Sequence, residues 1–211
     1  MAAQWNIREA KSLDQYDGFN ALKKHEAEGV DYLILSRKGS SSIAVMAPHG
    51  GGIEPGTVAI GHAVAGRDHT FWAFKGIKNT GNGGLHITST KFDEPGGMKI
   101  AMAAQTVITL HGCHGNKSAV YVGGRHEELK IRLQNAICRA GFNAEISTKA
   151  GLRGENTSNL CNRCITGRGV QLEITLAFRK RMFTPWEDRG IRNETDVFLR
   201  FVTAVRATLT L

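Results

Sequence analysis

His49 and Glu54 have the side chains and the spacing of part of a catalytic metal site. His49 follows Pro48 and precedes three glycines, and Glu54 comes five residues after the histidine. Because glycine adopts backbone torsions that other residues avoid, this stretch can fold back and direct an imidazole and a carboxylate at one point. A catalytic zinc site usually has three protein ligands and one open position. The alternative is a glycine-rich turn with a solvated glutamate and a histidine without a role.

His111 is the candidate for the third ligand. It follows the apolar run 106–110 just as His49 follows the apolar run 42–47. Ligands of open α/β sheets bind at the carboxyl ends of strands, so two histidines at neighbouring strand ends can approach one ion. We therefore expect Zn²⁺ bound by His49, Glu54 and His111, with a fourth position open to water.

Two further histidines compete for roles at this site. His114 could replace His111 as the ligand, or lie beside it and contact substrate. His86 has neighbours that alternate as on a strand, and it could be a ligand or hydrogen-bond substrate. The position of His111 directly at a strand end favours it over His114.

Glu173 is the candidate for a general base. It lies in Val-Gln-Leu-Glu-Ile-Thr, an otherwise largely apolar run. A buried charge is costly unless it is paired or used. Water activated by a metal needs a group that accepts its proton and passes it to the leaving amine, and a carboxylate suits this task. The alternative is a structural ion pair between Glu173 and a nearby arginine.

Arg163, Arg168 and Arg179 flank the run that contains Glu173 on both sides. A guanidinium group matches a carboxylate in a planar, bidentate geometry. With a formal net charge of +8, these residues indicate an anionic, carboxylate-bearing substrate. Plain solvated arginines are the alternative. No basic tail is present, and we therefore expect no nucleic-acid partner.

Cys161 and Cys164 have the spacing of half a zinc ribbon or of a redox pair. The other two cysteines, at positions 113 and 138, form no second close pair. A redox motif normally opens a helix after a strand, whereas this pair lies in a polar stretch. We therefore interpret both cysteines as structural or incidental.

The composition predicts one soluble globular domain over residues 1–211. Apolar residues make up 41% of the 211 positions and charged residues 22%, as in ordinary globular proteins. No run of 18 apolar residues and no secretory signal are found, which predicts no membrane partner and a cytoplasmic location with reduced thiols.

Strands alternate with helices along the chain, which predicts a three-layer α/β sandwich with a mixed, mostly parallel sheet between helices. His49, Glu54, His111 and Glu173 would then lie near the carboxyl ends of its strands. The expected strands cover 31–36, 42–47, 69–74, 106–110, 119–122, 142–147 and 169–176, and the expected helices cover 57–65, 98–105, 127–140 and 193–209, after a helical extension over 1–29 that packs on the domain.

Segments between residues 30 and 180 resemble, in unbroken order, the poly-γ-glutamate hydrolases of bacteria and their phages. The segments that carry this resemblance are His49-Gly-Gly-Gly-Ile-Glu54-Pro-Gly-Thr, Gly76-Ile-Lys, Leu85-His-Ile-Thr-Ser-Thr, Phe92-Asp-Glu-Pro, Leu110-His-Gly, Asn162-Arg163 and Gly169-Val-Gln-Leu-Glu. The combination is far more specific than any one motif.

The resemblance implies a fold like that of zinc carboxypeptidases, and zinc held by His49, Glu54 and His111 with Glu173 as the general base. It implies endo-type hydrolysis of the γ-glutamyl amide bonds of poly-γ-glutamate, an anionic polymer. If the protein is phage-derived, we expect it to be released from the cell by lysis. Zinc carboxypeptidases usually have two residues between histidine and glutamate, whereas four intervene here. The likeness to those enzymes is therefore one of architecture.

Two other functions remain alternatives. A non-catalytic binder of acidic polymers would account for the basic charge, and its binding would depend on salt but not on metal. A zinc amidohydrolase or peptidase could also act on another carboxylate-bearing amide, since one fold and site can serve several substrates.

Overall fold

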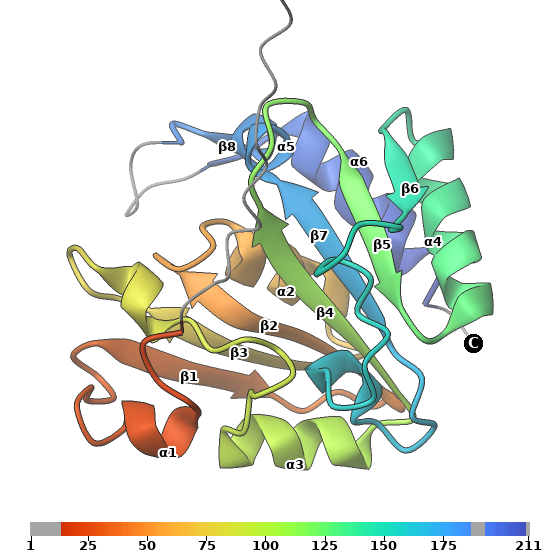
Figure 1. Cartoon of the computed structure of the whole chain (residues 1–211). Coiled ribbons are helices and arrows are strands. Elements are labelled where there is room, and N and C mark those ends of the chain that lie inside the picture. The colour runs from red at the N-terminus through yellow and green to blue at the C-terminus, as the bar shows by residue number, and fades with distance from the viewer. Residues whose placement is uncertain (1–13, 187–192, 210–211) are drawn as a thin grey trace, which may run out of the picture.

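The computed structural model describes residues 14–186 and 193–209. A seven-stranded sheet with the order β1-β3-β2-β4-β7-β5-β6 runs through it (Figure 1). The pairs β1–β3 and β5–β7 are antiparallel, and the other four pairs are parallel. The expected mixed, mostly parallel sheet is confirmed. Its strands are β1 (Tyr32–Arg37), β2 (Ile43–Gly51), β3 (Thr70–Gly76), β4 (Thr106–Cys113), β5 (Val120–Gly124), β6 (Ala144–Ile146) and β7 (Val170–Thr175).

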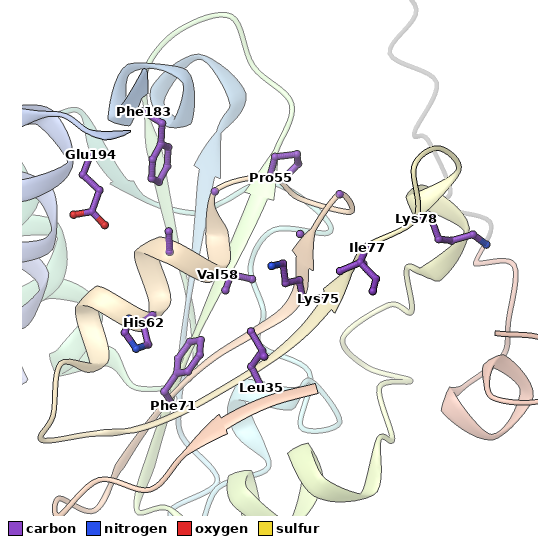
Figure 2. A pocket seen from close by; sticks show the side chains of 15 residues that line it. Leu35, Pro55, Val58, His62, Phe71, Lys75, Ile77, Lys78, Phe183 and Glu194 are labelled. Atoms are coloured by element: carbon purple, nitrogen blue, oxygen red, sulfur yellow. The ribbon is translucent and has the colours of Figure 1, made fainter. Parts of the chain in front are cut away.

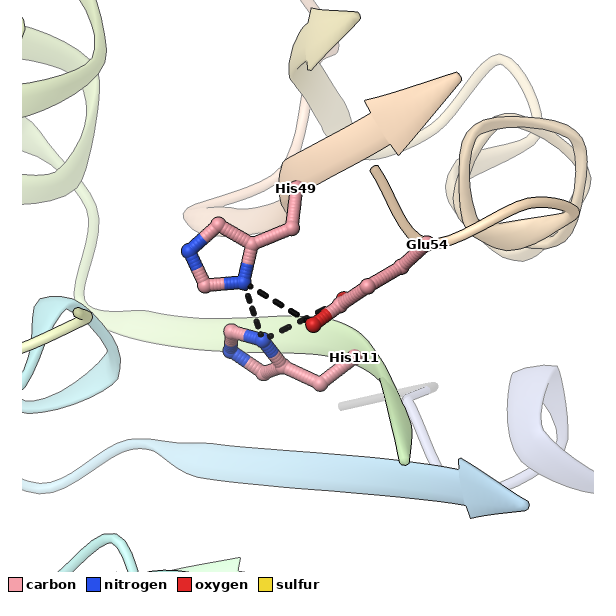
Figure 3. Close-up of side chains that lie close together, drawn as sticks. All are labelled: His49, Glu54 and His111. Atoms are coloured by element: carbon pink, nitrogen blue, oxygen red, sulfur yellow. Dashed lines mark hydrogen bonds and ion pairs between the residues drawn. The ribbon is translucent and has the colours of Figure 1, made fainter. Parts of the chain in front are cut away.

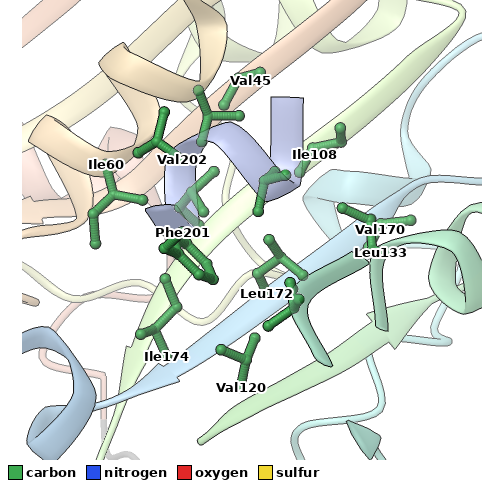
Figure 4. Close-up of a cluster of buried hydrophobic side chains, with 14 of the residues drawn as sticks. Val45, Ile60, Ile108, Val120, Leu133, Val170, Leu172, Ile174, Phe201 and Val202 are labelled. Atoms are coloured by element: carbon green, nitrogen blue, oxygen red, sulfur yellow. The ribbon is translucent and has the colours of Figure 1, made fainter. Parts of the chain in front are cut away.

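Helices cover both faces of this sheet and bury an apolar cluster on each. Val45 of β2 points into the first cluster and Met46 into the second, because side chains alternate along a strand. Figure 4 shows residues of the first cluster. The first face is covered by α2 (Thr57–Ala65), α4 (Glu127–Arg139), α5 (Leu176–Met182) and α6 (Asp196–Arg206), and the second by α1 (Phe19–Leu22), α3 (Pro95–Ala103) and the 3₁₀ turns η1 (Asn82–Leu85) and η2 (Leu160–Asn162).

The helices are short. The longest in the described ranges, α4, has 13 residues, and its buried side chains recur on one face. No helix in the described parts of the chain combines the length and the apolar character that a membrane span requires.

Strand β2 continues through His49, although the sequence predicts that it ends before this residue. Its parallel pairing with β4 extends only to Met46, and its register against β3 shifts after Ala47. Pro48 fits here because it has no N–H group to contribute to a ladder, and β4 no longer pairs with β2 at this position. The His49 side chain therefore projects from an irregular strand end and not from a free loop.

Two helices differ from the sequence-based expectation. Helix α3 begins at Pro95, three residues earlier than predicted, because the Glu94 carboxylate accepts hydrogen bonds from the N–H groups of Gly96 (2.9 Å) and Gly97 (2.5 Å). Helix α5 was not predicted, and it begins directly after β7. The Thr175 side chain caps its first turn. β7 thus leads without a loop into a helix that lies close to the site.

The helical extension expected over residues 1–29 is wrong in the described part of that range. Only α1 is helical there, and residues 1–13 lie outside the described residues. Two carboxylates tie the segment to the rest of the chain: the Asp93 carboxylate accepts from the Phe19 N–H group (2.5 Å), and the Asp14 carboxylate accepts from the Thr88 N–H group (3.0 Å). It packs on the second face of the sheet through buried aromatic and aliphatic side chains.

Candidate metal centre

His49, Glu54 and His111 converge on one point, as Figure 3 shows. His49 Nδ1 lies 3.1 Å from Glu54 Oε1 and 3.1 Å from His111 Nδ1, and His111 Nδ1 lies 3.7 Å from Glu54 Oε2. One ligand atom from each residue lies within 4.8 Å of the others. Both histidines are buried, and the Glu54 side chain is 13% exposed. This is the one group among the described residues with the composition and spacing to hold a metal ion.

The donor atoms fit a divalent cation. Two imidazoles and a carboxylate form a common ligand set of catalytic zinc sites. With Zn–N distances of about 2.0–2.1 Å, a tetrahedral ion separates two ligand nitrogens by roughly 3.3 Å. The 3.1 Å between the two Nδ1 atoms is close to that separation. The side chains are therefore already spaced for one small ion.

A main-chain carbonyl sets the tautomer of His49. Nε2–H donates to the carbonyl oxygen of Ile87 at 2.8 Å. Because a neutral imidazole has one N–H group, Nδ1 is left with a lone pair facing Glu54 and His111. On the other ring, His111 Nε2 lies 3.4 Å from Ser89 Oγ. Both imidazoles thus have a partner on the side away from the candidate metal position.

The turn after β2 brings Glu54 back to His49. The N–H group of Glu54 donates to the His49 carbonyl at 2.8 Å, which closes the turn. Gly51 has a φ of 66°, and a Cβ atom there would collide with the carbonyl oxygen of Gly76. A residue with a side chain would therefore strain this turn and displace the carboxylate.

The carboxylate of Glu54 is held in its ionised form. Burial opposes ionisation, but where the His49 and His111 rings carry a proton toward Glu54 in the metal-free protein, their charges and hydrogen bonds outweigh burial and hold the pKa of Glu54 well below its usual range. Glu54 Oε2 also accepts the N–H group of Gly112 at 2.8 Å. Glu54 is thus a charged, oriented oxygen donor at the edge of the cluster.

Glu173 lies directly beside His111 on the next strand. The two residues are paired in the register of the parallel strands β4 and β7, so their side chains leave the same face of the sheet. Burial, with the nearby charge of Glu54, raises the pKa of Glu173 to about 7, against the opposing charges of His111 and others. A carboxylate with a pKa near neutrality can both accept and release a proton at physiological pH.

Two amides orient Glu173, and sequence reasoning missed both. Gln171 Nε2 donates to Glu173 Oε1 at 3.0 Å, and Asn159 Nδ2 donates to Gln171 Oε1 at 2.9 Å. The spacing of Gln171 and Glu173 contains a usable signal, since residues two apart on a strand share a face. Asn159 is remote in sequence and has no such signal.

Arg179 is buried, not at the surface as its predicted contact with substrate requires. It is 4% exposed, and its guanidinium group donates to the carbonyl oxygens of Pro55 (2.6 Å), Ile174 (3.0 Å) and Cys113 (3.4 Å). Each carbonyl belongs to a residue one or two positions after Glu54, Glu173 or His111. Arg179 therefore ties together the three chain segments that present the acidic and histidine side chains.

The two competing histidines lie outside the group of three. The His86 ring contacts the His49 ring at a tilt of 35° with centroids 4.1 Å apart, and its Nδ1 lies 2.9 Å from an oxygen of Asp14. His86 is thus a neighbour of the site rather than a member of the candidate ligand set. His114 is exposed in the loop after β4. Asp14 is a further residue near the site that the sequence did not indicate.

Arg163 and Arg168 are not brought to the cluster. Both are exposed, and both lie toward the amino end of β7, whereas Glu173 lies toward its carboxyl end. The N–H group of Ile165 donates to the carbonyl of Ala104, which precedes β4 and marks that end of the sheet. Contact between these arginines and a substrate at the cluster would require a chain long enough to pass from one end of the sheet to the other.

The cysteine pair contributes to the second apolar cluster. Cys161 and Cys164 are 0% and 7% exposed, and all four cysteines are free thiols. Burial holds the pKa of the Cys161 thiol far above its usual range, which makes the thiol unreactive. The two side chains thus lie in the packing of the fold.

The comparisons with known proteins agree with this geometry. Residues 16–204 match the poly-gamma-glutamate hydrolase family. The chain is 33% identical over 206 residues to the SPbeta prophage-derived UPF0714 protein YoqZ of Bacillus subtilis (strain 168), covering 96% of this chain and 74% of that protein. A bacteriophage poly-gamma-glutamate hydrolase structure is similar with a TM-score of 0.89 and 32% identity, covering 93% and 96% of the two chains. The zinc-free apo structure of YNDL is similar with a TM-score of 0.87 and 32% identity, covering 93% and 97%. This chain belongs to the poly-gamma-glutamate hydrolase family.

Proposed function

We propose that this chain is a zinc-dependent hydrolase that cleaves the γ-glutamyl amide bonds of poly-γ-glutamate. The observation that carries the proposal is the buried group of His49, Glu54 and His111, with Glu173 paired in register beside His111. Membership of the family supports the substrate, and the zinc-free form of a relative supports zinc as the metal. We propose further that residues 1–211 act as one hydrolase domain.

His49 Nδ1, His111 Nδ1 and a Glu54 oxygen are the atoms that would hold the ion. When bound, zinc supplies a Lewis acid that polarises the amide carbonyl and acidifies water. The bonds from His49 to the Ile87 carbonyl and from the Gly112 N–H group to Glu54 orient the donors from outside.

Glu173 would move the proton. Its carboxylate accepts a proton from the attacking water and returns it to the nitrogen of the leaving amine, so the amide C–N bond breaks and the nitrogen leaves as a neutral amine. Gln171 holds Oε1. The other oxygen is then the one directed at the substrate, and burial limits competition from bulk water.

Chelation tests the proposal directly. The protein is incubated with long poly-γ-glutamate alone, with a chelator, and with a chelator followed by added zinc, and polymer length is followed by size-exclusion chromatography. We expect shortening in the first and third reactions only. Polymer that binds the protein but stays intact, with or without zinc, would identify a binder of acidic polymers instead. Cleavage that resists complete metal removal would contradict the role of the ion.

A further inference from the structure

A cavity of ≈ 600 Å³ lies on the first face of the sheet, next to the turn that presents Glu54 (Figure 2). Gly51, Gly52 and Pro55 of this turn form part of its wall. Glu54 itself points from the same turn to the histidines. The cavity and the candidate metal centre are thus separated by a single turn of chain. Its volume is in the range of about 300–1,000 Å³ that is usual for sites of small ligands.

Lys75 contributes a cationic side chain to the wall of this cavity. Phe71 and Ala73 of β3 point into the first apolar cluster, so Lys75 leaves the same face of the strand. Its stem passes close to the turn, because a Cβ atom on Gly51 would lie 2.8 Å from Lys75 Cγ. Within residues 14–186 and 193–209 its ammonium group has no hydrogen bond and no ion pair.

The remaining lining defines the chemistry of an occupant. Leu35, Val58 and Phe183 supply apolar walls. His62 and Glu194 also line the cavity, and Figure 2 shows both on the side away from Lys75, so the Glu194 carboxylate does not face the ammonium end. Lys78 also borders the cavity, but its ammonium group is already paired with Glu26 at 2.7 Å. Among the described lysines and arginines that line the cavity, Lys75 is therefore the unpaired one, and it lies beside the apolar walls. A half-desolvated cation favours an anionic partner, and the walls favour methylene groups beside it.

We propose that this cavity binds a glutamyl unit of the polymer chain at a distance from the cleaved bond, with Lys75 on the carboxylate of that unit; the proposal rests on the proposed function. A γ-linked glutamyl unit combines two methylene groups with a free carboxylate, which matches apolar walls around one cation. A polymer chain held at the metal centre needs to cross only the Gly51–Gly56 turn to reach the cavity. The subsite would then add affinity for long chains without touching the reacting bond.

The first experiment compares Lys75→Met with Lys75→Arg and with Lys99→Met, a matched control on the exposed side of α3 at the other face of the sheet. Loss of one charge-assisted contact should raise KM for long polymer about tenfold with kcat unchanged. The arginine variant should retain most of the affinity, and the control should behave as the wild type. Short γ-linked oligomers that cannot span the turn should show no difference between the variants.

A binding measurement distinguishes a failure of this subsite proposal from a failure of the proposed function. Affinity for intact long polymer is measured in the Glu173→Gln background, with and without Lys75→Met, by titration calorimetry. A drop of about tenfold supports the subsite even if the wild type cleaves another amide. Unchanged affinity and unchanged KM in Lys75→Met would overturn the subsite whatever the activity. Thermal unfolding of each variant checks the fold, and Lys75→Gln replaces the methionine variant if that one is destabilised.

Discussion

The guanidinium group of Arg179 donates a hydrogen bond to the carbonyl oxygen of Pro55, 2.6 Å away and 124 positions earlier in the chain. Pro55 directly follows Glu54, so this bond fixes the end of the turn that presents the carboxylate. The same guanidinium group also bonds the chain just after Glu173 and His111. Arg179 is therefore expected to position the candidate metal centre without touching the ion.

Replacing Arg179 by alanine should weaken zinc binding about 10- to 100-fold, as for other groups that hold metal ligands in place. The dissociation constant is measured by competition with a chromogenic chelator. Added guanidinium ion should restore part of the affinity, because the space beside Gly112 that Arg179 fills is left open. Arg206→Ala is the control, since Arg206 bonds the carbonyls of Ala63 and Val64 away from the site. Equal zinc affinity in both variants would rule out the positioning role.

His49→Ala should abolish stoichiometric zinc binding, whereas His114→Ala should keep it. The first substitution removes a buried donor atom of the cluster, and the second changes an exposed side chain outside it. Zinc content is measured by mass spectrometry after gel filtration in metal-free buffer. Normal zinc content in His49→Ala would show that the ligands lie elsewhere.

Glu173→Gln should stabilise the zinc-free protein at neutral pH but not in acid. The folded state raises the pKa of Glu173 from 4.5 to about 7, so between these values it binds more protons than the unfolded state. Glu173 therefore costs stability progressively as pH rises from 4.5 to about 7, by up to about 3 kcal/mol. Urea unfolding of both proteins from pH 4.5 to 8 measures the difference, with Glu145→Gln as an exposed control. A difference that does not vary with pH would contradict the burial argument.

Gln171→Met should lower kcat about tenfold while zinc content and KM stay nearly unchanged. The substitution removes the N–H donor to Glu173 Oε1, so the carboxylate loses its orientation. Loss of a donor to the charged form also raises the pKa of Glu173, which moves the acidic limb of the rate profile to higher pH. Steady-state kinetics across pH test both effects. A tenfold loss of zinc affinity instead would place Gln171 in the support of the metal ligands.

Most strands of the sheet and the three candidate ligands could be predicted from the sequence, because the strands are apolar runs and the functional side chains lie in or next to such runs. His111 ends such a run, and Glu173 interrupts one. The role of Arg179 could not be predicted, since α5 follows β7 without a break and its basic residues look like those of a surface helix. Arg163 and Arg168 were misplaced because nearness to a strand in sequence does not show which end of the sheet a residue joins. The link from Asp14 to His86 spans 72 positions and leaves no periodic signal.

The bond from His49 to Ile87 is made to the main chain, and this has an evolutionary consequence. Any residue at position 87 offers the same carbonyl, so point mutation there cannot delete the partner that fixes the imidazole tautomer. The orientation of Glu173, in contrast, depends on the side chain of Gln171 and can be lost or retuned by one codon change. Descendants of this chain can therefore vary the strength of the base while inheriting an unchanged presentation of His49.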